Sequence, residues 1–390
     1  MNRKPLVIVG GVIANKYRNG GAVWTRLNWV LGMQKLGFDV VFIEQIDQLN
    51  CLDEQGRVTS FELSSSLAYF KKVMQEFGLS ESAALVYEDG RECYGKSLQE
   101  IGELASDADL LINITGHLHL PEIMESRICK VYIDLDPGYT QLWYQAGMLD
   151  THFLAHDQYF TIAEAIGTNE CTIPVGDIPW QTTRQPVVLD LWPVSTRGDS
   201  ERFTTIASWR DDYGTLHHKG QRLGVKAHEF RRFIRFPELV EQTCEIALNL
   251  YEDDRADLDL LLKHGWQVKD PGLVVPDPAT FRKYVQTSGA EFSVAKEMYT
   301  KTRGGWFSDR TVRYLASGKP ALVQDTGFSH RYPVGEGLLA FGSMKSALRG
   351  AGDISRNYAA HCRAARQIAE DFFDSDKVLG NLVERIGIFP

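Results

Sequence analysis

Several features are absent from this 390-residue sequence. No apolar run reaches the 18 residues of a membrane-spanning helix, and the first apolar stretch, residues 6–9, is too short for a secretion signal. The six cysteines are far apart and include no C-x-x-C pair, which disfavours a disulfide framework or a zinc knuckle. We therefore expect a soluble, cytoplasmic protein with reduced thiols and no integral membrane segment.

Basic residues are in the minority. There are 42 Lys and Arg against 51 Asp and Glu, for a formal charge of -9. A protein that follows a phosphate backbone is normally basic, so we expect no nucleic-acid partner. The chain is 44% hydrophobic and 24% charged, which excludes a disordered or collagen-like protein. Its length is more than one ordinary domain needs and suits two.

The first half alternates between predicted strands and helices. The apolar residues 6–9 end in Gly10 and Gly11, as a buried parallel strand would. A polar loop then leads to a helix expected at 22–36, which Gly37 closes. Further strands are expected at 40–43, 110–114, 131–135 and 160–162. This alternation predicts a doubly wound parallel sheet.

The second half repeats the pattern after a proline-rich stretch. Its expected strands are 203–207, 245–250, 273–275, 291–294 and 321–323. Its expected helices are 236–243, 279–287 and 308–317, followed by a largely helical stretch at 354–386. We predict an α/β protein of two Rossmann-like domains, with an N-terminal domain at 1–175, a linker at 176–200, a C-terminal domain at 201–353 and a helical segment at 354–390. Ligands would bind in the central cleft, at the carboxyl ends of the strands.

A glycine turn before a helix is the strongest local signal. Gly304 and Gly305 lead into a helix whose N-cap is expected at Ser308. The free N–H groups of a helix start can bind an anion. Arg310 would lie in the first turn, where a cation is unfavourable unless an anion is bound beside it. We therefore expect Arg310 to grip a diphosphate, and its removal to leave the unbound protein equally stable. An ordinary capped helix with a solvated arginine is the alternative.

These elements resemble the donor-binding element of GT-B glycosyltransferases. The resemblance covers residues 304–327 and, in the first half, the glycine-containing segment 10–21, which is similar to the N-terminal glycine loop of that family. It implies that the C-terminal domain holds a nucleotide sugar and the N-terminal domain an acceptor, with the last helix crossing back. The position of Lys226 resembles that of a lysine that neutralises the donor diphosphate. The implied donor-binding residues are Gly20, Gly21, Lys226, Ser293, Lys296, Phe307, Ser308, Asp309, Arg310, Thr326 and Gly327.

The sequence departs from both main subclasses of that family. The retaining class carries two glutamates eight residues apart, and the matching positions here are Gly305 and Arg313. The plant-type inverting class opens the element with His-Cys-Gly, where this chain has Gly-Gly-Trp. The sequence therefore leaves the stereochemistry of transfer open.

The acceptor side offers three catalytic candidates. His117 follows a predicted strand and titrates near neutrality, so it is the first choice of base; a hydrogen-bonded loop histidine is the alternative. Asp134 and Asp136 end the next strand, where Asp-x-Asp could hold a divalent ion or simply form a turn. Metal-dependent GT-A enzymes lack a second Rossmann-like half. We therefore expect no metal and no other cofactor.

Two other functions remain open from the sequence. A nicotinamide oxidoreductase would suit two Rossmann-like halves, and Glu44 stands at the end of the second strand, where ribose binding needs an acid. However, the glycines of segment 10–21 do not form G-x-G-x-x-G. A GT-B-like nucleotide-sugar epimerase would bind the same donor without an acceptor. The preferred hypothesis is a glycosyltransferase that moves a sugar from a nucleotide diphosphate to a small-molecule or glycan acceptor.

Overall fold

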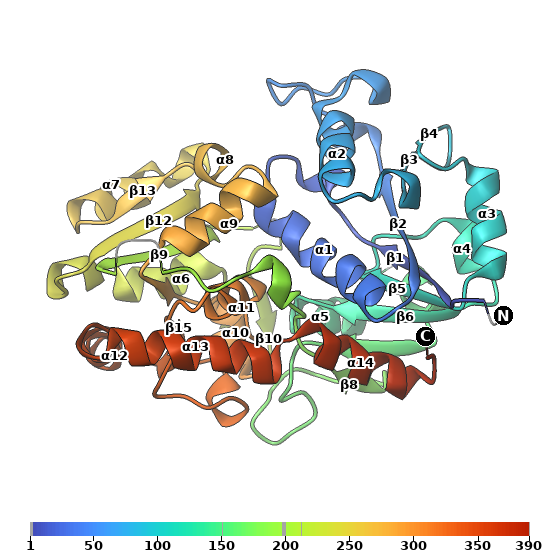
Figure 1. Ribbon diagram of the computed structural model, residues 1–390. Coiled ribbons are helices and arrows are strands. Elements are labelled where there is room, and N and C mark those ends of the chain that lie inside the picture. The colour runs from blue at the N-terminus through green and yellow to red at the C-terminus, as the bar shows by residue number, and fades with distance from the viewer. Residues whose placement is uncertain (1–2, 150, 197–199, 212, 390) are drawn as a thin grey trace.

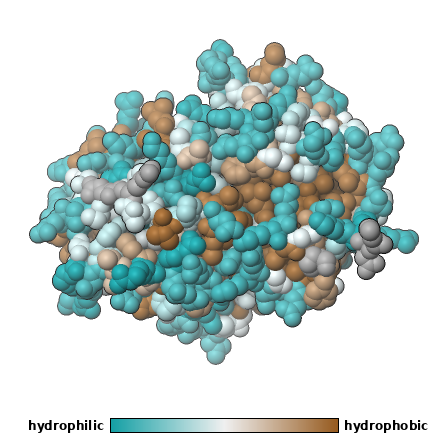
Figure 2. Space-filling view, viewed as in Figure 1, coloured by the Kyte–Doolittle hydropathy of each residue, from teal (hydrophilic) through white to brown (hydrophobic). Residues whose placement is uncertain are grey.

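The protein consists of two halves that lie side by side, each built on its own β-sheet (Figure 1). The computed structural model describes residues 3–149, 151–196, 200–211 and 213–389. Within them, no helix combines the length and apolarity that crossing a membrane requires. Figure 2 shows that most of the viewed face is hydrophilic, whereas apolar side chains gather over the first half.

The first half holds an eight-stranded sheet in the order β4-β3-β2-β1-β5-β6-β7-β8. Neighbouring strands run parallel, except that β3 and β4 form an antiparallel pair. The strands are β1 (Leu6–Gly10), β2 (Asp39–Ile46), β3 (Ala83–Tyr87), β4 (Glu92–Tyr94), β5 (Leu110–Ile114), β6 (Cys129–Asp134), β7 (Gln158–Thr161) and β8 (Trp180–Thr182). The helices are α1 (Gly20–Lys35), α2 (Ser65–Glu76), α3 (Leu98–Asp107), α4 (Pro121–Met124) and α5 (Tyr139–Gln145).

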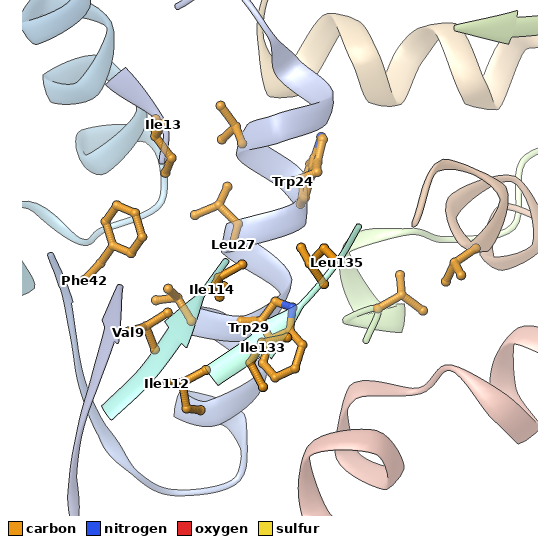
Figure 3. Close-up of a cluster of buried hydrophobic side chains, with 14 of the residues drawn as sticks. Val9, Ile13, Trp24, Leu27, Trp29, Phe42, Ile112, Ile114, Ile133 and Leu135 are labelled. Carbon is orange, nitrogen blue, oxygen red and sulfur yellow. The ribbon is translucent and has the colours of Figure 1, made fainter. Parts of the chain in front are cut away.

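Both faces of this sheet are covered, because successive side chains of a strand point to opposite faces. On β1, Val7 and Val9 join the apolar cluster that contains α1, and Ile8 joins the cluster that contains α3 and α4. Figure 3 shows Leu27 on the side of α1 that faces the strands, whereas Trp24 projects from another side of the helix. A continuous apolar run such as residues 6–9 is therefore what a doubly covered strand requires.

The second half holds a six-stranded parallel sheet in the order β13-β12-β9-β14-β15-β16. The strands are β9 (Arg202–Ser208), β12 (Thr243–Asn249), β13 (Gln267–Lys269), β14 (Ala290–Ser293), β15 (Ala321–Gln324) and β16 (Leu338–Phe341). A separate hairpin is formed by β10 (Leu216–His218) and β11 (Gln221–Leu223). The helices are α6 (Lys226–Phe230), α7 (Arg255–Lys263), α8 (Pro271–Val274), α9 (Pro278–Thr287), α10 (Glu297–Thr302), α11 (Asp309–Ala316), α12 (Met344–Arg356) and α13 (Tyr358–Phe372).

The chain returns to the first half through α14 (Ser375–Ile386), which packs on α1. A side chain at Gly32 would place its Cβ 2.5 Å from Leu379, so the two helices touch at a glycine. Lys35 also forms an ion pair of 3.2 Å with Asp376. In Figure 1 the red helices α13 and α14 run beneath both halves.

The expected pair of doubly wound sheets is confirmed, but three local expectations are wrong. Residues 273–275 are not a strand, because Asp270 caps helix α8 and Pro271 occupies its first turn. Residues 236–243 form only a short 3-10 turn before β12 begins. The expected linker at 176–200 contains strand β8, which pairs with β7 in the first sheet, because proline is tolerated just before an edge strand. Residues 197–199 lie outside the described part.

Candidate active site between the two sheets

The carboxyl end of β6 meets the carboxyl ends of β9 and β14 at a cluster of charged and aromatic side chains. Asp136 follows β6, Asp211 follows β9 and Lys296 follows β14. The Lys296 ammonium lies 2.8 Å from an Asp211 carboxylate oxygen and 3.6 Å from one of Asp136. It also lies 4.8, 4.9 and 5.5 Å from the ring centroids of Tyr139, Tyr213 and Tyr299. Strand ends of both sheets therefore build one site, as the doubly wound topology requires.

Asp136 is the carboxylate that the first half contributes to this site. Its Oδ1 accepts a hydrogen bond of 2.9 Å from the Tyr299 hydroxyl, and its Oδ2 one of 3.3 Å from Tyr213. The Asp136 charge is the largest cause raising the pKa of Tyr213, and burial does the same for Tyr299. Both phenols therefore stay protonated and donate to Asp136. The side chain keeps 27% of its exposure, so a substrate can reach it.

Asp134, two residues earlier, is fully buried behind the site. Its carboxylate accepts hydrogen bonds from Thr140 (2.8 Å), Gln141 (2.7 Å) and Thr161 (2.7 Å), and from the backbone N–H of Asp136 (3.1 Å). Burial raises its pKa to about 6 despite these donors. These hydrogen bonds allow Asp134 to stabilise the turn that carries Asp136. A catalytic role for Asp134 stays a prediction.

His117 is held at the end of β5 by a strained turn. Thr115 and Gly116 have φ angles of 58° and 70°, a left-handed conformation that is costly for threonine. The buried amide of Asn113 fixes the loop by bonding both the N–H (3.1 Å) and the carbonyl (2.7 Å) of Leu118. The His117 side chain is exposed to the hollow described below; crowding by the surrounding protein, followed by the charges of Arg26 and Lys16, lowers its pKa from the ordinary value. The imidazole is thus neutral at pH 7 and can accept a proton.

Basic side chains gather on the second half of the site. Lys226 is 8% exposed, and its ammonium donates to the carbonyl of Val294. Burial, followed by the charges of Arg310 and Lys296, holds the pKa of Lys226 well below its usual value. Three cations from α6, α11 and the end of β14 therefore lie within electrostatic reach of one another.

Arg310 is bound by its own chain rather than free. Its guanidinium donates to Glu291 (2.6 Å), to the carbonyl of Ile206 (2.7 Å) and to Ser293 (2.7 Å). Glu291 has no exposed surface, and the Arg310 side chain is 12% exposed. The expectation that Arg310 lies unpaired in the absence of phosphate is therefore wrong, because the buried Glu291 already neutralises it. Donor binding by Arg310 and Ser293 stays a prediction.

The start of α11 contacts the first half. Ser308 caps the helix by accepting from the Arg310 N–H (3.3 Å), as the sequence predicts. Asp309 receives a hydrogen bond of 2.6 Å from Thr25 of α1 and forms an ion pair of 2.9 Å with Arg313. Arg313 is 2% exposed and donates to the same Thr25 hydroxyl at 3.0 Å. The position where retaining enzymes carry a glutamate thus holds a buried arginine that ties α11 to α1.

The other donor-binding candidates of this region are buried. Phe307 stacks on Phe373 with 5.2 Å between ring centroids. Thr326 donates a hydrogen bond of 2.6 Å to the carbonyl of Trp306. Gly327 has φ 101°, and a Cβ there would lie 3.0 Å from the Arg303 carbonyl. These residues shape the turn before α11, and their contact with a donor stays a prediction.

Gly20 and Gly21 open α1 against the second half rather than against free space. The Gly20 N–H donates to the carbonyl of Val275 at 3.2 Å, and a Cβ on Gly20 would lie 2.2 Å from the carbonyl oxygen of Asp277. Gly21 packs in the same way against the ring of Phe281. Glycine is required here by close approach of the two halves, and donor contact by these glycines stays a prediction.

The same close approach extends along residues 270–278, which we call the docking segment. Its carbonyl oxygens at Gly272, Pro276 and Pro278 accept hydrogen bonds from the first half. The respective donors are Arg18 (2.5 Å), Tyr69 (2.9 Å) and Trp24 (2.8 Å). Backbone acceptors therefore set how the second half sits on α1 and α2.

Sequence reasoning missed four residues of the site: Arg26, Asp211, Tyr213 and Tyr299. Asp211 and Tyr213 follow directly after a predicted strand, so the rule that found His117 could have found them. Arg26 lies on α1, and the Nε of its guanidinium is buried without a hydrogen-bond partner among the described residues. Charges of Asp309, Glu44, Tyr213 and Asp136 surround it. No local pattern marks Arg26, because only the meeting of the two halves gives it these neighbours.

A hollow of about 390 Å³ opens beside His117 on the first half. It lies over the carboxyl ends of β1, β2, β3 and β5, and its lining includes Lys16, Asp47, Glu88, Asp89 and His117. His117 therefore lines the hollow and also lies close enough to Asp136 for that charge to act on its pKa.

Glu44 does not serve as a ribose ligand in this structure. It is fully buried and accepts hydrogen bonds from the backbone N–H groups of Ile13 (2.8 Å), Ala14 (2.9 Å) and Asn15 (2.9 Å). Burial raises its pKa to about 7. With Val275 bonded to Gly20 at the start of α1, both anchor points of a Rossmann dinucleotide site are already occupied. This arrangement argues against the oxidoreductase alternative.

The arrangement of possible metal ligands bears on the Asp-x-Asp pattern of Asp134 and Asp136. Among the described residues, no group of three or more His, Cys, Asp or Glu side chains is arranged to hold a metal ion. The six cysteines are all free thiols.

Comparison with known proteins identifies the fold. No protein-family model and no curated protein sequence matches the chain. Among solved structures, an alpha-glucosyltransferase in complex with UDP is 11% identical, with 99% of this chain and 100% of that chain covered and a TM-score of 0.61. Anabaena HepE in complex with UDP-glucose is 11% identical, with 98% and 99% covered and a TM-score of 0.58. A putative UDP-N-acetylglucosamine 2-epimerase from Listeria monocytogenes is 12% identical, with 99% and 97% covered and a TM-score of 0.51. The chain thus has the GT-B fold over its full length.

Proposed function

We propose that this protein is a glycosyltransferase that moves a hexose from a nucleoside diphosphate-sugar to an acceptor. The observation that carries the proposal is the gathering of Lys226, Lys296 and Arg310 where the strand ends of the two sheets meet. Burial and two like charges make the charged form of Lys226 unfavourable. A bound diphosphate would reverse that penalty. UDP is the first nucleotide to test, because UDP is bound in the solved alpha-glucosyltransferase and UDP-glucose in HepE.

In the proposed transfer, basic side chains stabilise the leaving group, and a neutral base accepts a proton from the acceptor. The acceptor oxygen attacks the anomeric carbon, and the bond from that carbon to the diphosphate oxygen breaks. The departing diphosphate keeps the bonding electrons, and its charge is stabilised by Lys226 and Lys296. His117 takes the acceptor proton, since its lowered pKa leaves the imidazole neutral at pH 7 and it stands at the carboxyl end of β5 beside the hollow. Asp136, fixed by two phenols, is placed to orient hydroxyl groups of the donor sugar.

We also propose that the reaction needs no metal ion. In GT-A enzymes carboxylates and a divalent ion neutralise the diphosphate, and here lysine and arginine supply positive charge at the corresponding place. Asp134 is occupied by four donors, which leaves Asp136 without the second carboxylate of an Asp-x-Asp site.

Calorimetric titration with UDP tests this proposal. Lys226→Met should weaken UDP binding tenfold or more and leave uridine binding nearly unchanged, because the lysine meets the diphosphate and not the nucleoside. Lys263→Met, on the exposed end of α7, is the matched control. Equal UDP affinity in wild type and Lys226→Met would refute the placement of the donor.

Product analysis separates the remaining functions. The epimerase alternative is favoured by the Listeria neighbour, and it predicts that the donor sugar changes configuration with no acceptor present. A glycosyltransferase instead releases UDP and forms a product heavier than the acceptor by one sugar residue. Mass spectrometry of a UDP-sugar incubated with and without acceptors distinguishes the two.

A further inference from the structure

The hollow beside His117 is lined almost entirely by side chains that exchange hydrogen bonds. Only Val12 and Ile46 among its lining residues are apolar, and the others carry an amide, a carboxylate, an imidazole or an amine. Small-molecule sites usually have volumes of about 300–1,000 Å³ and mostly apolar linings. At about 390 Å³, this hollow is of adequate size, and most of its lining residues are polar.

One wall of the hollow carries three carboxylates, two of which are held by hydrogen bonds. Asp47 uses Oδ1 to accept from the backbone and side-chain N–H groups of Asn50, both at 3.0 Å. Glu88 uses Oε1 to accept from the backbone N–H of Gln48 at 3.0 Å. Each carboxylate is thereby fixed through one oxygen, and its second oxygen remains for a ligand hydroxyl. Asp89 is exposed on the same wall.

The backbone at Glu88 indicates that a side chain is kept there at a cost. Its φ angle is 51°, in the left-handed region, where glycine is unstrained and glutamate is not. Gly90, two residues later, also has a positive φ of 95°. The Glu88 carboxylate offsets part of this cost through its hydrogen bond with the Gln48 N–H, and Glu88 is among the residues that line the hollow.

From these observations we propose that the hollow binds the acceptor, and that the acceptor is an uncharged, polyhydroxylated molecule, a small saccharide or polyol. Carboxylates and amides accept from and donate to hydroxyl groups, whereas an apolar acceptor would leave these groups desolvated and unpaired. Three carboxylates on one wall also repel a phosphorylated acceptor. His117 at the inner end receives the proton of the hydroxyl that reacts. This assignment rests on the proposed function, because it treats the ligand of the hollow as the acceptor.

Saccharide binding can be measured directly, without turnover. The wild-type protein is saturated with UDP and titrated with sucrose, lactose and cellobiose, using saturation-transfer NMR and calorimetry. Glucose 6-phosphate and 1-octanol serve as the anionic and apolar probes. We expect at least one neutral saccharide to bind at millimolar or lower concentration, and the phosphate and the alcohol to bind at least tenfold more weakly.

Variants locate the binding. Asp89→Asn and Glu88→Gln keep the side-chain size, and the glutamine can still accept from Gln48. Each should weaken saccharide binding about tenfold and leave UDP affinity and the melting temperature unchanged. Asp39→Asn removes an exposed carboxylate from the opposite, amino-terminal end of β2 and should change nothing.

Two results would overturn the inference. One is that 1-octanol or glucose 6-phosphate binds better than every neutral saccharide. The other is that a saccharide binds equally well to wild type, Asp89→Asn and Glu88→Gln. If UDP does not bind, the proposed function is wrong. Saccharide affinity is then measured without nucleotide, so the inference about the hollow is tested separately.

Discussion

Removing the Arg310 guanidinium should destabilise the unbound protein strongly. The side chain is 12% exposed and its partner Glu291 has no exposed surface, so Arg310→Ala leaves a carboxylate buried without its counter-charge. Oε2 of Glu291 already lacks a hydrogen-bond partner among the described residues, so the remaining charge would have little compensation. Removing one partner of a buried ion pair lowers the free energy of unfolding by about 3–5 kcal/mol. The bonds to Ile206 and Ser293 are lost in the same change.

The assay is thermal and urea unfolding, followed by a probe in the second half such as the fluorescence of the buried Trp209 and Trp266. At about 2–4 °C per kcal/mol for a domain of this size, Arg310→Ala should melt about 6–20 °C below wild type. The double variant Arg310→Met with Glu291→Leu removes both charges and keeps the volume. It should recover most of the loss, because replacing a whole buried pair with apolar groups is often neutral.

Two outcomes would refute this reasoning. In the first, Arg310→Ala has the same melting temperature as wild type and loses only UDP affinity. The guanidinium then binds phosphate, and the ion pair with Glu291 contributes nothing to stability. If the double variant is as unstable as the single one, the loss comes from packing or from the bonds to Ile206 and Ser293 rather than from a stranded charge.

Three further predictions concern the interface, the base and the metal. Gly20→Ala should lower stability and UDP affinity, since its Cβ would lie 2.2 Å from a backbone oxygen; Gly102→Ala in α3, with its nearest neighbour at 3.7 Å, should be neutral or stabilising. The acid limb of kcat/KM should fall below pH 6.5, because the lowered pKa of His117 keeps the base unprotonated to a lower pH; His117→Gln should abolish this limb. Activity should persist in EDTA, and a requirement for Mn²⁺ would point to Asp134 and Asp136.

The sequence predicted most strands of the two sheets because these strands are buried on both faces. Short, mostly apolar runs such as 110–114 and 321–323, with glycines and prolines between the elements, indicate such strands. The buried strands β3 and β16 were not predicted, although both are mostly apolar. The short strands β4, β8 and β13 were also missed, since each is three residues long and at most half-buried. Their pairing is decided by neighbouring strands and leaves little trace in their composition.

The site was only partly predictable for a related reason. His117, Asp136 and Lys296 follow strands, so the carboxyl-end rule located them. Whether a charged side chain at such a place is free or neutralised depends on partners far along the chain. Arg310 meets Ile206 across 104 positions of sequence, and the glycine turn before it packs against the first half. Long-range pairing of this kind is set by the tertiary fold and is not encoded in local spacing.

The return of α14 to the first half has a consequence for biosynthesis. The face of α1 at Gly32 is covered by Leu379, which is made after roughly 340 further residues. At about 5–20 residues per second, α1 waits roughly 17–70 s on the ribosome for its partner. During that interval the first sheet can form, but one side of its central helix stays open to water and to chaperones. The first half, although translated first, is therefore among the last parts of the molecule to be finished.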